Sequence, residues 1–257
     1  MLEKRIIPVI SGHKEEFIKT VNFKNRQYIG DPLNAIKIFN EKFVDEIIIL
    51  DIGSESRENT KIDFKYIKNL IDECFMPVTY GGNIQNLDDA KKLFDLGIDK
   101  ISLNNSILKN FLFINELSNY FGTQSISVSV DVTKTSLGDY KIYNYKNDKL
   151  YEKYDLKEYL TEIEKNGAGE IIINSVHKDG LMKGMDLNLA KFIKDEIDVP
   201  LVFYGGVGKL SHLKEVFSKG IDAIACSSFF CFHGDFKSIL ITYPFEELDK
   251  IKHNDHL

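Results

Sequence analysis

The sequence predicts a single α/β domain of 257 residues that folds as a (β/α)8 TIM barrel with a twofold internal half-barrel repeat. Short apolar, β-branched runs alternate with longer stretches of helical periodicity, the pattern typical of parallel strands joined by helices. Eight such units are present, and one barrel commonly takes about 250 residues. An open doubly wound sheet is the alternative, but eight alternating units close most naturally into a barrel.

The eight expected strands are short and mostly apolar. They span Arg5 to Ser11, Glu46 to Ile52, Pro77 to Tyr80, Lys100 to Asn104, Ser125 to Asp131, Glu170 to Ser175, Pro200 to Tyr204 and Asp222 to Ser227. Runs such as Ile47-Ile48-Ile49-Leu50 show no polar alternation, which favours strands buried on both faces of a parallel sheet. The first outer helix should begin at Asp31-Pro32, a capping residue followed by a proline at the first helical position.

An internal repeat divides the chain into two halves of four units. Tyr80-Gly81-Gly82 recurs as Tyr204-Gly205-Gly206, and Glu46-Ile47-Ile48-Ile49 recurs as Glu170-Ile171-Ile172-Ile173, so positions 80 and 46 return at 204 and 170, an offset of 124 in both cases. Residues 133–155 interrupt the pattern with several tyrosines around a turn-like Lys146-Asn147-Asp148. We expect an inserted hairpin there, after the fifth strand.

Composition narrows the classes of partner. The chain has 33 basic and 39 acidic residues and a net charge of −6, so it lacks the broad positive field that favours nucleic acid. Its three cysteines form no ligand cluster, and we expect no metal, no cofactor and a reduced, cytoplasmic location. The start, Met1-Leu2-Glu3-Lys4-Arg5, precedes no apolar signal segment, and no run approaches the roughly 18 apolar residues of a membrane span.

Polar groups at the strand ends should share one mouth, because the loops after barrel strands meet at one face. Gly81-Gly82 and Gly205-Gly206 allow a close approach of backbone to an anion, and Asn104-Asn105 and Ser227-Ser228 add donors at the next strand ends. A glycine pair alone can serve only turn geometry, but its duplication favours binding. We therefore expect two phosphate cradles and a phosphorylated small-molecule substrate that carries two phosphates or is similarly long.

The residues resemble HisF, the cyclase subunit of imidazole glycerol phosphate synthase, from Lys4 to about Phe232. The matching positions are Lys19, Asn22-Phe23, Gly30-Asp31-Pro32, Leu50-Asp51-Ile52, Asp99-Lys100, Asp131, Gly167-Ala168-Gly169-Glu170, Asp179-Gly180 and Gly205-Gly206. The resemblance implies that a HisH-like glutaminase forms a heterodimer with the barrel. It also implies that ammonia travels through the barrel to a phosphorylated substrate at the mouth.

The resemblance assigns roles at both ends of the barrel. An ammonia gate at the floor maps onto Arg5, Glu46, Lys100 and Glu170, although a structural ion-pair network is the alternative reading. Asp99 matches a position at the glutaminase interface. At the mouth, Lys19, Asp51, Asp179 and Gly180 match substrate-side positions, and for Asp51 a simple strand-end cap is the alternative.

The catalytic pair is incomplete. HisF uses two aspartates for acid–base work, and Asp131 matches one of them, whereas Ser11 stands at the position of the other. A serine hydroxyl has no carboxylate-like pKa, so the pair needed to close an imidazole ring is missing. Asn83, His177 and Leu181 also depart from the family pattern around the mouth.

The retained floor and altered mouth indicate a paralogue. Three segments, at residues 26–32, 73–77 and 241–244, resemble the WbuZ-type branch, which is associated with sugar amidation in surface glycans, including lipopolysaccharide. That branch implies a separate sugar amidotransferase as a further partner. The alternatives are the cyclase of histidine biosynthesis and a noncatalytic scaffold that activates the glutaminase. No cysteine lies in a glutaminase nucleophile elbow, so the ammonia should come from a partner.

Overall fold

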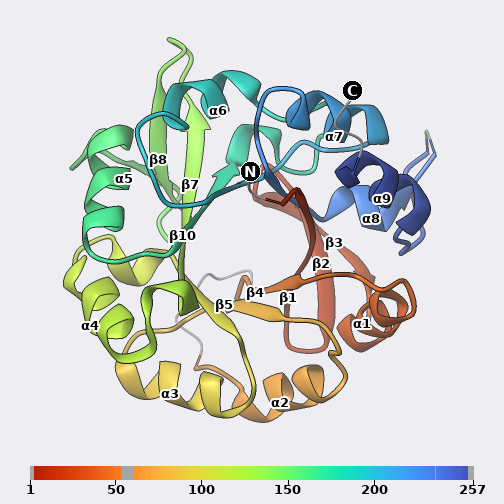
Figure 1. Ribbon diagram of the computed structural model, residues 1–257, viewed down its shortest axis with the longest axis horizontal. Coiled ribbons are helices and arrows are strands. Elements are labelled where there is room, and N and C mark those ends of the chain that lie inside the picture. Colours follow the sequence, from red (N-terminus) through yellow and green to blue (C-terminus); the bar gives the residue numbers. More distant parts are fainter. Residues whose placement is uncertain (1–2, 54–60, 235, 254–257) are drawn as a thin grey trace.

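Eight parallel strands form a closed barrel in the computed structural model, which describes residues 3–53, 61–234 and 236–253 (Figure 1). The neighbour order is β10-β11-β12-β1-β4-β5-β6-β7, and β7 pairs with β10 to close the ring. The barrel strands are β1 Arg5–His13, β4 Ile47–Asp51, β5 Val78–Gly81, β6 Lys100–Leu103, β7 Ile126–Lys134, β10 Glu170–Ser175, β11 Leu201–Tyr204 and β12 Ala223–Cys226. The predicted barrel is confirmed, all eight expected strands are present, and the open-sheet alternative is wrong.

Helices cover the outside of the barrel (Figure 1). They are α1 Pro32–Glu41, α2 Phe64–Asp72, α3 Leu87–Asp95, α4 Leu112–Phe121, α5 Leu156–Lys165, α6 Leu187–Ile193, α7 Leu210–Phe217, α8 Ser228–Cys231 and α9 Phe245–His253, with short 3-10 turns η1 Asn105–Ile107, η2 Thr123–Ser125 and η3 Val176–Lys178. Helix α1 begins where predicted, because the Asp31 side chain accepts a hydrogen bond from the backbone N–H of Leu33. Within the described residues, no helix combines the length and apolarity needed to span a membrane.

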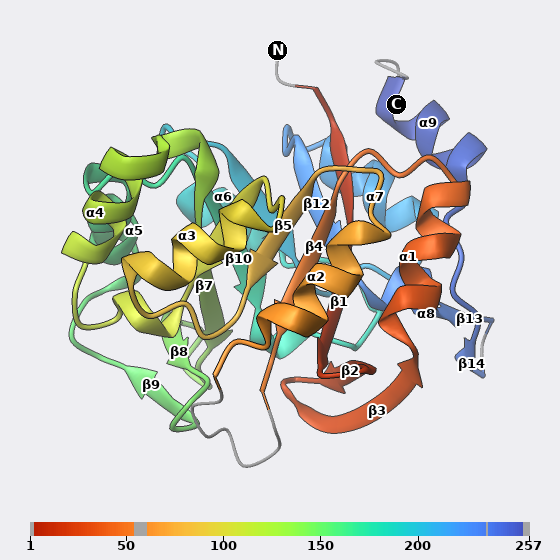
Figure 2. The ribbon, with the colours of Figure 1, turned by 90° about the horizontal axis from the view of Figure 1, so that it is seen from below.

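Two antiparallel hairpins extend the barrel strands at one end. Strands β2 Glu16–Val21 and β3 Lys24–Gly30 continue from β1, and strands β8 Tyr140–Asn144 and β9 Lys149–Tyr151 continue from β7. Figure 2 shows both hairpins at the end of the barrel opposite the two chain termini. The second hairpin falls within the expected insertion. The first was not predicted, because its turn depends on Asn22 and Phe23 adopting positive φ angles of 51° and 60°.

A third, small hairpin pairs β13 Phe232–His233 with β14 Ser238–Ile239 beside α8. It lies on the outer surface near the end of β3 (Figure 2), where a Cβ on Gly30 would lie 3.9 Å from Ile241 Cδ1.

The interior of the barrel is apolar on one side and polar on the other. Side chains alternate between the inside and the outside of a barrel strand, so each strand contributes every second residue to the interior. Strands β1, β4, β10, β11 and β12 contribute a cluster of eight buried residues: Ile7, Val9, Ile48, Ile172, Val202, Tyr204, Ala223 and Ala225. The larger hydrophobic core is a separate cluster that joins the outer face of the strands to the helices.

Candidate active site

Four charged residues meet at the amino-terminal end of the strands. The Arg5 guanidinium binds both Glu46 oxygens at 2.6 Å and one Glu170 oxygen at 2.5 Å, and Lys100 Nζ lies 2.9 Å from the other Glu170 oxygen. Burial alone would raise the pKa of Glu170, but Lys100 and Arg5 outweigh it and lower the pKa. The predicted group is therefore one continuous chain of ion pairs across the barrel floor.

Small hydroxyl side chains line the barrel interior above Lys100. The strand register places Thr79 beside Ile48, Ser102 beside Gly81, and Ser127 between Ser102 and Glu170. Ser129 is two residues further along β7 and reaches the mouth. The Ser102 and Ser127 hydroxyls are buried with no hydrogen-bond partner among the described residues. A polar track thus runs along β5, β6 and β7 from the ionic floor to the mouth.

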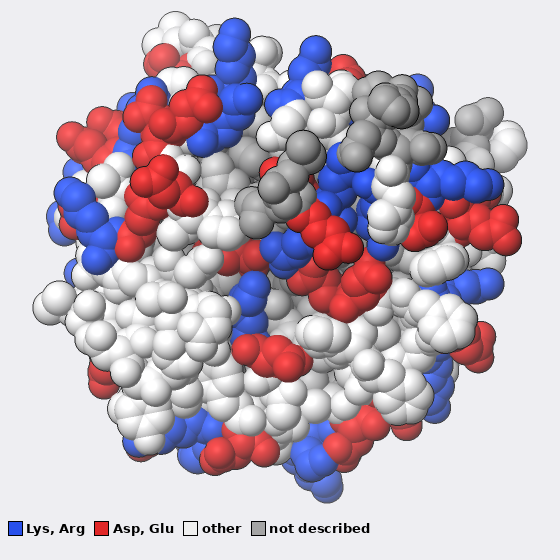
Figure 3. Space-filling model, viewed as in Figure 1, with Lys and Arg blue, Asp and Glu red and all other residues white. Residues whose placement is uncertain are grey.

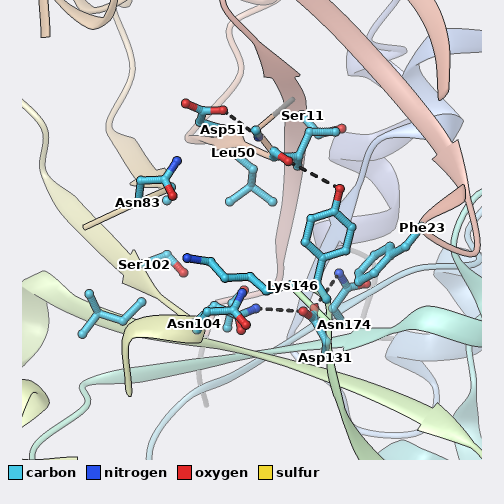
Figure 4. A pocket seen from close by; sticks show the side chains of 18 of the residues that line it. Ser11, Phe23, Leu50, Asp51, Asn83, Ser102, Asn104, Asp131, Lys146 and Asn174 are labelled. Atoms are coloured by element: carbon cyan, nitrogen blue, oxygen red, sulfur yellow. Dashed lines mark hydrogen bonds between the residues drawn. The ribbon is translucent and has the colours of Figure 1, made fainter. Parts of the chain in front are cut away.

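A cavity of about 430 Å³ occupies the carboxyl-terminal mouth (Figure 4). Nine of the predicted site residues line it: Ser11, Lys19, Asp51, Gly81, Gly82, Asn104, Asn105, Asp131 and Asp179. Five others, Gly180, Gly205, Gly206, Ser227 and Ser228, do not. Among the described residues no cluster of three or more His, Cys, Asp or Glu side chains is arranged to hold a metal ion.

Asp131 is a buried carboxyl group at the inner wall of this cavity. Its carboxylate accepts hydrogen bonds from Asn104 Nδ2 at 2.9 Å and Asn174 Nδ2 at 3.2 Å, as Figure 4 shows. Burial raises the pKa of Asp131 to about 7, against the two hydrogen bonds, and the nearby Asp179 adds to the rise. Both protonation states are therefore populated near neutral pH, which suits a general acid or base.

Ser11 lines the same cavity, but its hydroxyl is hydrogen-bonded to the backbone of a neighbouring strand. Ser11 Oγ donates a hydrogen bond of 2.7 Å to the carbonyl oxygen of Ile18 in β2. This bond holds the β2–β3 hairpin against the end of β1. Ser11, which the resemblance to HisF pairs with Asp131, therefore makes a structural contact.

Lys19 forms a buried ion pair at the back of the mouth. Its ammonium lies 3.1 Å from Asp179 Oδ1 and 3.4 Å from the Tyr204 hydroxyl, and the side chain is almost fully buried. Burial alone would lower the pKa of Lys19, but Asp179 outweighs it and raises the pKa. Thr20 Oγ1 donates to Asp179 Oδ2 at 2.7 Å. Asp179 therefore anchors the β2–β3 hairpin.

The second glycine pair lies behind this ion pair. Gly205, Gly206, Ser227 and Ser228 are all buried. The Gly184 N–H donates to the Gly206 carbonyl at 2.8 Å, and a Cβ on Gly206 would lie 2.3 Å from the Gly184 oxygen. The backbone of this loop is packed against protein rather than exposed to the cavity.

Asp51 caps the end of its strand. One carboxylate oxygen accepts from the Gly53 N–H at 2.8 Å and lies 3.0 Å from His13 Nδ1. This geometry matches the strand-end cap that the sequence left open as an alternative. Asp51 also lines the cavity, so both contacts keep its carboxylate at the rim in a defined orientation.

Several lining residues were not predicted. Asn174 follows Glu170 and Ile172 at the two-residue spacing of inward-facing positions, so strand periodicity could have found it. Lys146 and Tyr145 come from the turn between β8 and β9, and Phe23 comes from the turn between β2 and β3. Nothing in the local sequence shows that these two turns fold back over the mouth.

The opposite face of the barrel contains the ionic floor. Figure 3 shows basic and acidic side chains near its centre and a broad uncharged area over α3 and α4. The loops before β4 and β5 expose Phe43 and Phe75, and Tyr120 is exposed near the end of α4. Asp99 is exposed beside Lys100, and its Oδ2 accepts from the Val78 N–H at 2.8 Å.

Comparisons with known proteins agree with this geometry. The family model described as histidine biosynthesis protein matches residues 5–237. A provisionally named imidazole glycerol phosphate synthase subunit hisF2 of Pseudomonas aeruginosa is 38% identical over 245 residues, covering 95% of this chain and 97% of the relative. A provisionally named HisF subunit of Leptospira interrogans is 39% identical over 251 residues, covering 96% and 97%. Imidazole glycerol phosphate synthase subunit HisF of Dictyoglomus turgidum is 34% identical over 233 residues, covering 90% and 91%.

Proposed function

The chain belongs to the HisF family of histidine biosynthesis proteins, and on that premise we propose that it accepts ammonia from a HisH-like glutaminase bound as a heterodimer. The barrel delivers this ammonia to its mouth and supports amination of a phosphorylated or nucleotide-linked substrate. The process it serves is sugar amidation in surface-glycan synthesis, together with a separate sugar amidotransferase.

The cysteines support the proposed partner. A glutaminase nucleophile is an accessible thiolate with a lowered pKa. Cys226 and Cys231 are buried, and burial raises the pKa of Cys231 to about 12. Burial likewise raises the pKa of Cys74 to about 12. None of the three has the features of a glutaminase nucleophile, which supports a partner as the source of ammonia.

The polar track between floor and mouth is the observation that carries the proposal. Ammonia is small and neutral, and unpartnered hydroxyls such as those of Ser102 and Ser127 can exchange hydrogen bonds with it along the way. The charged floor admits it only when an ion pair such as that of Lys100 with Glu170 opens. The track ends beside Asp131, where the chemistry would occur.

Asp131 would move the proton in the amination step. When the ammonia nitrogen adds to an electrophilic C=O or C=N carbon of the substrate, the π-electron pair moves to the oxygen or nitrogen of that group. The attacking nitrogen then loses a proton, which a carboxylate with a pKa of about 7 can accept. The other two aspartates that line the cavity each contact a basic side chain: Asp51 contacts His13, and Asp179 forms an ion pair with Lys19. A single carboxylate without an ion-pair partner among the described residues that line the cavity fits amination better than ring closure, which needs a pair of acid–base groups.

Two other functions are distinguishable. The relationship to the Dictyoglomus turgidum subunit favours the cyclase of histidine biosynthesis as the second candidate. Supplying the phosphoribulosyl aminoimidazole substrate with ammonium tests it. We expect no imidazole glycerol phosphate, and robust formation of that product would refute sugar amidation.

A noncatalytic scaffold is tested in the complex with the glutaminase. We expect Asp131→Asn to lower the amidation rate of the full complex. The scaffold reading would replace the proposal if Asp131→Asn left amidation unchanged while Asp99→Ala lowered glutamine hydrolysis. Asp95→Ala, at the end of α3 on the same face, is the matched control for Asp99→Ala.

A further inference from the structure

The two half-barrels differ at one inward-facing position of the mouth. Gly81 pairs with Leu50 in the first half, and Tyr204 pairs with Asn174 in the second. Leu50 and Asn174 are equivalent residues of the repeat, so Gly81 and Tyr204 are equivalent as well. The sequence match aligned Tyr80 with Tyr204, and the strand register corrects this alignment by one residue.

Because position 81 is a glycine, the first phosphate cradle, formed by Gly81-Gly82 and Asn104-Asn105, is open to the cavity. Gly81 and Gly82 line the cavity, and a Cβ on Gly81 would lie 2.9 Å from Leu50 Cδ2. Asn83, which follows them, adopts a positive φ of 53°, a conformation that asparagine tolerates better than most residues. Figure 4 shows Lys146 reaching into the cavity on the side of Asn83 and Asn104. Backbone amides, side-chain amides and a cation therefore face the same space.

Tyr204 occupies the corresponding place in the second phosphate cradle, the one expected at Gly205-Gly206 and Ser227-Ser228. Tyr204 is buried, and its hydroxyl accepts a hydrogen bond from Lys19 at 3.4 Å. The charge of Lys19 is compensated by Asp179, so it offers no net positive charge to a second anion. Gly205 and Gly206 are buried and do not line the cavity. Tyr204, Lys19 and Asp179 line the cavity in their place, so an anion in the cavity meets these side chains rather than the glycine amides.

We propose that the mouth binds a ligand with a single phosphate-type end group, held at Gly81-Gly82-Asn83 and Asn104-Asn105, and that Tyr204 excludes ligands with phosphates at both ends. The expectation of two phosphate cradles is thereby reduced to one. The remainder of the ligand extends toward Asp131 along the aromatic wall of Phe23 and Tyr145, whose rings meet edge to face at 5.6 Å. This inference deepens the proposed function by naming its substrate class.

The test compares ligands that differ by one phosphate. Calorimetric titration of the full chain with fructose 6-phosphate, fructose 1,6-bisphosphate and inorganic phosphate measures affinity and stoichiometry. We expect one phosphate site per chain, and affinities for the two sugar phosphates within about threefold of each other. Two phosphate sites, a bisphosphate bound at least about tenfold more tightly, or no saturable binding would each overturn the inference.

Two variants locate the site. Lys146→Met should weaken phosphate binding about five- to tenfold, whereas Lys149→Met, on exposed β9, should leave it unchanged. Equal effects of the two variants would place the site elsewhere. Tyr204→Gly should make the bisphosphate bind more tightly than the monophosphate.

If Tyr204→Gly fails to fold, the wild-type comparison of the two sugar phosphates decides by itself. These titrations involve no amination. A chain that binds one phosphate but does not support amination would therefore refute the proposed function alone.

Discussion

Gly180 and Thr20 meet so closely that a Cβ on Gly180 would lie 2.2 Å from the Thr20 carbonyl oxygen. Gly180 also adopts a positive φ of 71°. The contact lies next to Asp179, the residue that holds Lys19 and Thr20. Packing of the β2–β3 hairpin over the mouth therefore depends on the absence of a side chain at position 180.

Gly180→Ala should displace this hairpin and lower the free energy of unfolding by about 2 to 4 kcal/mol, since a steric clash is added to backbone strain. Gly220→Ala is the matched control, because Gly220 has a nearly identical φ of 70° but no atom within 4 Å of its Cβ. That variant should lose only about 1 kcal/mol. Denaturant unfolding measures both, and equal losses would contradict the clash.

Asp131→Asn should abolish the acid–base step and change the pH dependence of stability. Because the pKa of Asp131 rises to about 7 on folding, the folded state retains a proton that the unfolded state releases above about pH 4. The wild type therefore loses stability between about pH 4 and 7, and the variant should not. Thermal melts should show the variant gaining a few kcal/mol relative to the wild type at pH 8 but little at pH 4. If the stability difference between the variant and the wild type were the same at pH 4 and at pH 8, the raised pKa of Asp131 would be refuted.

Ser127→Leu should obstruct the polar track without touching the mouth. We expect glutamine-dependent amination by the complex to fall at least about tenfold, while amination with added ammonium, which can enter at the mouth, stays within about twofold. Ser127→Ala keeps the space open and should retain most of the glutamine-dependent rate. Equal losses with both nitrogen sources would mean that ammonia does not travel past Ser127.

Arg5→Ala should lower the free energy of unfolding by about 2 to 3 kcal/mol, because it leaves Glu46 and the buried Glu170 without their shared partner. Since the pKa of Glu170 is lowered in the fold, its contribution is present above its unfolded pKa and is lost as the pH falls through the folded value. The loss of unfolding free energy caused by Arg5→Ala should therefore be smaller at acid pH than at neutral pH.

Lys157→Ala is the control for Arg5→Ala, because it breaks an exposed ion pair with Glu196 and should cost less than about 0.5 kcal/mol. Urea unfolding at neutral and acid pH measures both variants. An equal loss in the two variants would show that the floor network adds no stability.

Much of the site could be predicted because its residues follow strand ends. Asn104 and the pair Gly81-Gly82 come directly from the rule that barrel loops share one mouth, Asp131 came from the resemblance to HisF, and all of them line the cavity. The contributions of Lys146 and Phe23 could not be predicted, because each belongs to a hairpin whose docking depends on contacts far away in the chain. That Gly205 and Gly206 are buried and do not line the cavity could not be predicted either, because burial depends on packing between distant segments.

The amino-acid sequence by itself determined the eight strands, the helix start at Asp31 and the position of the charges at the barrel floor, because periodicity and capping are properties of neighbouring residues. Only the tertiary structure decided that Tyr204 rather than Gly205 is the counterpart of Gly81, and that Lys19 pairs with Asp179. Strand register and hairpin docking are set by packing between residues far apart in the chain, from 30 positions for Asn174 and Tyr204 to 160 for Lys19 and Asp179, and a local pattern carries no record of that packing.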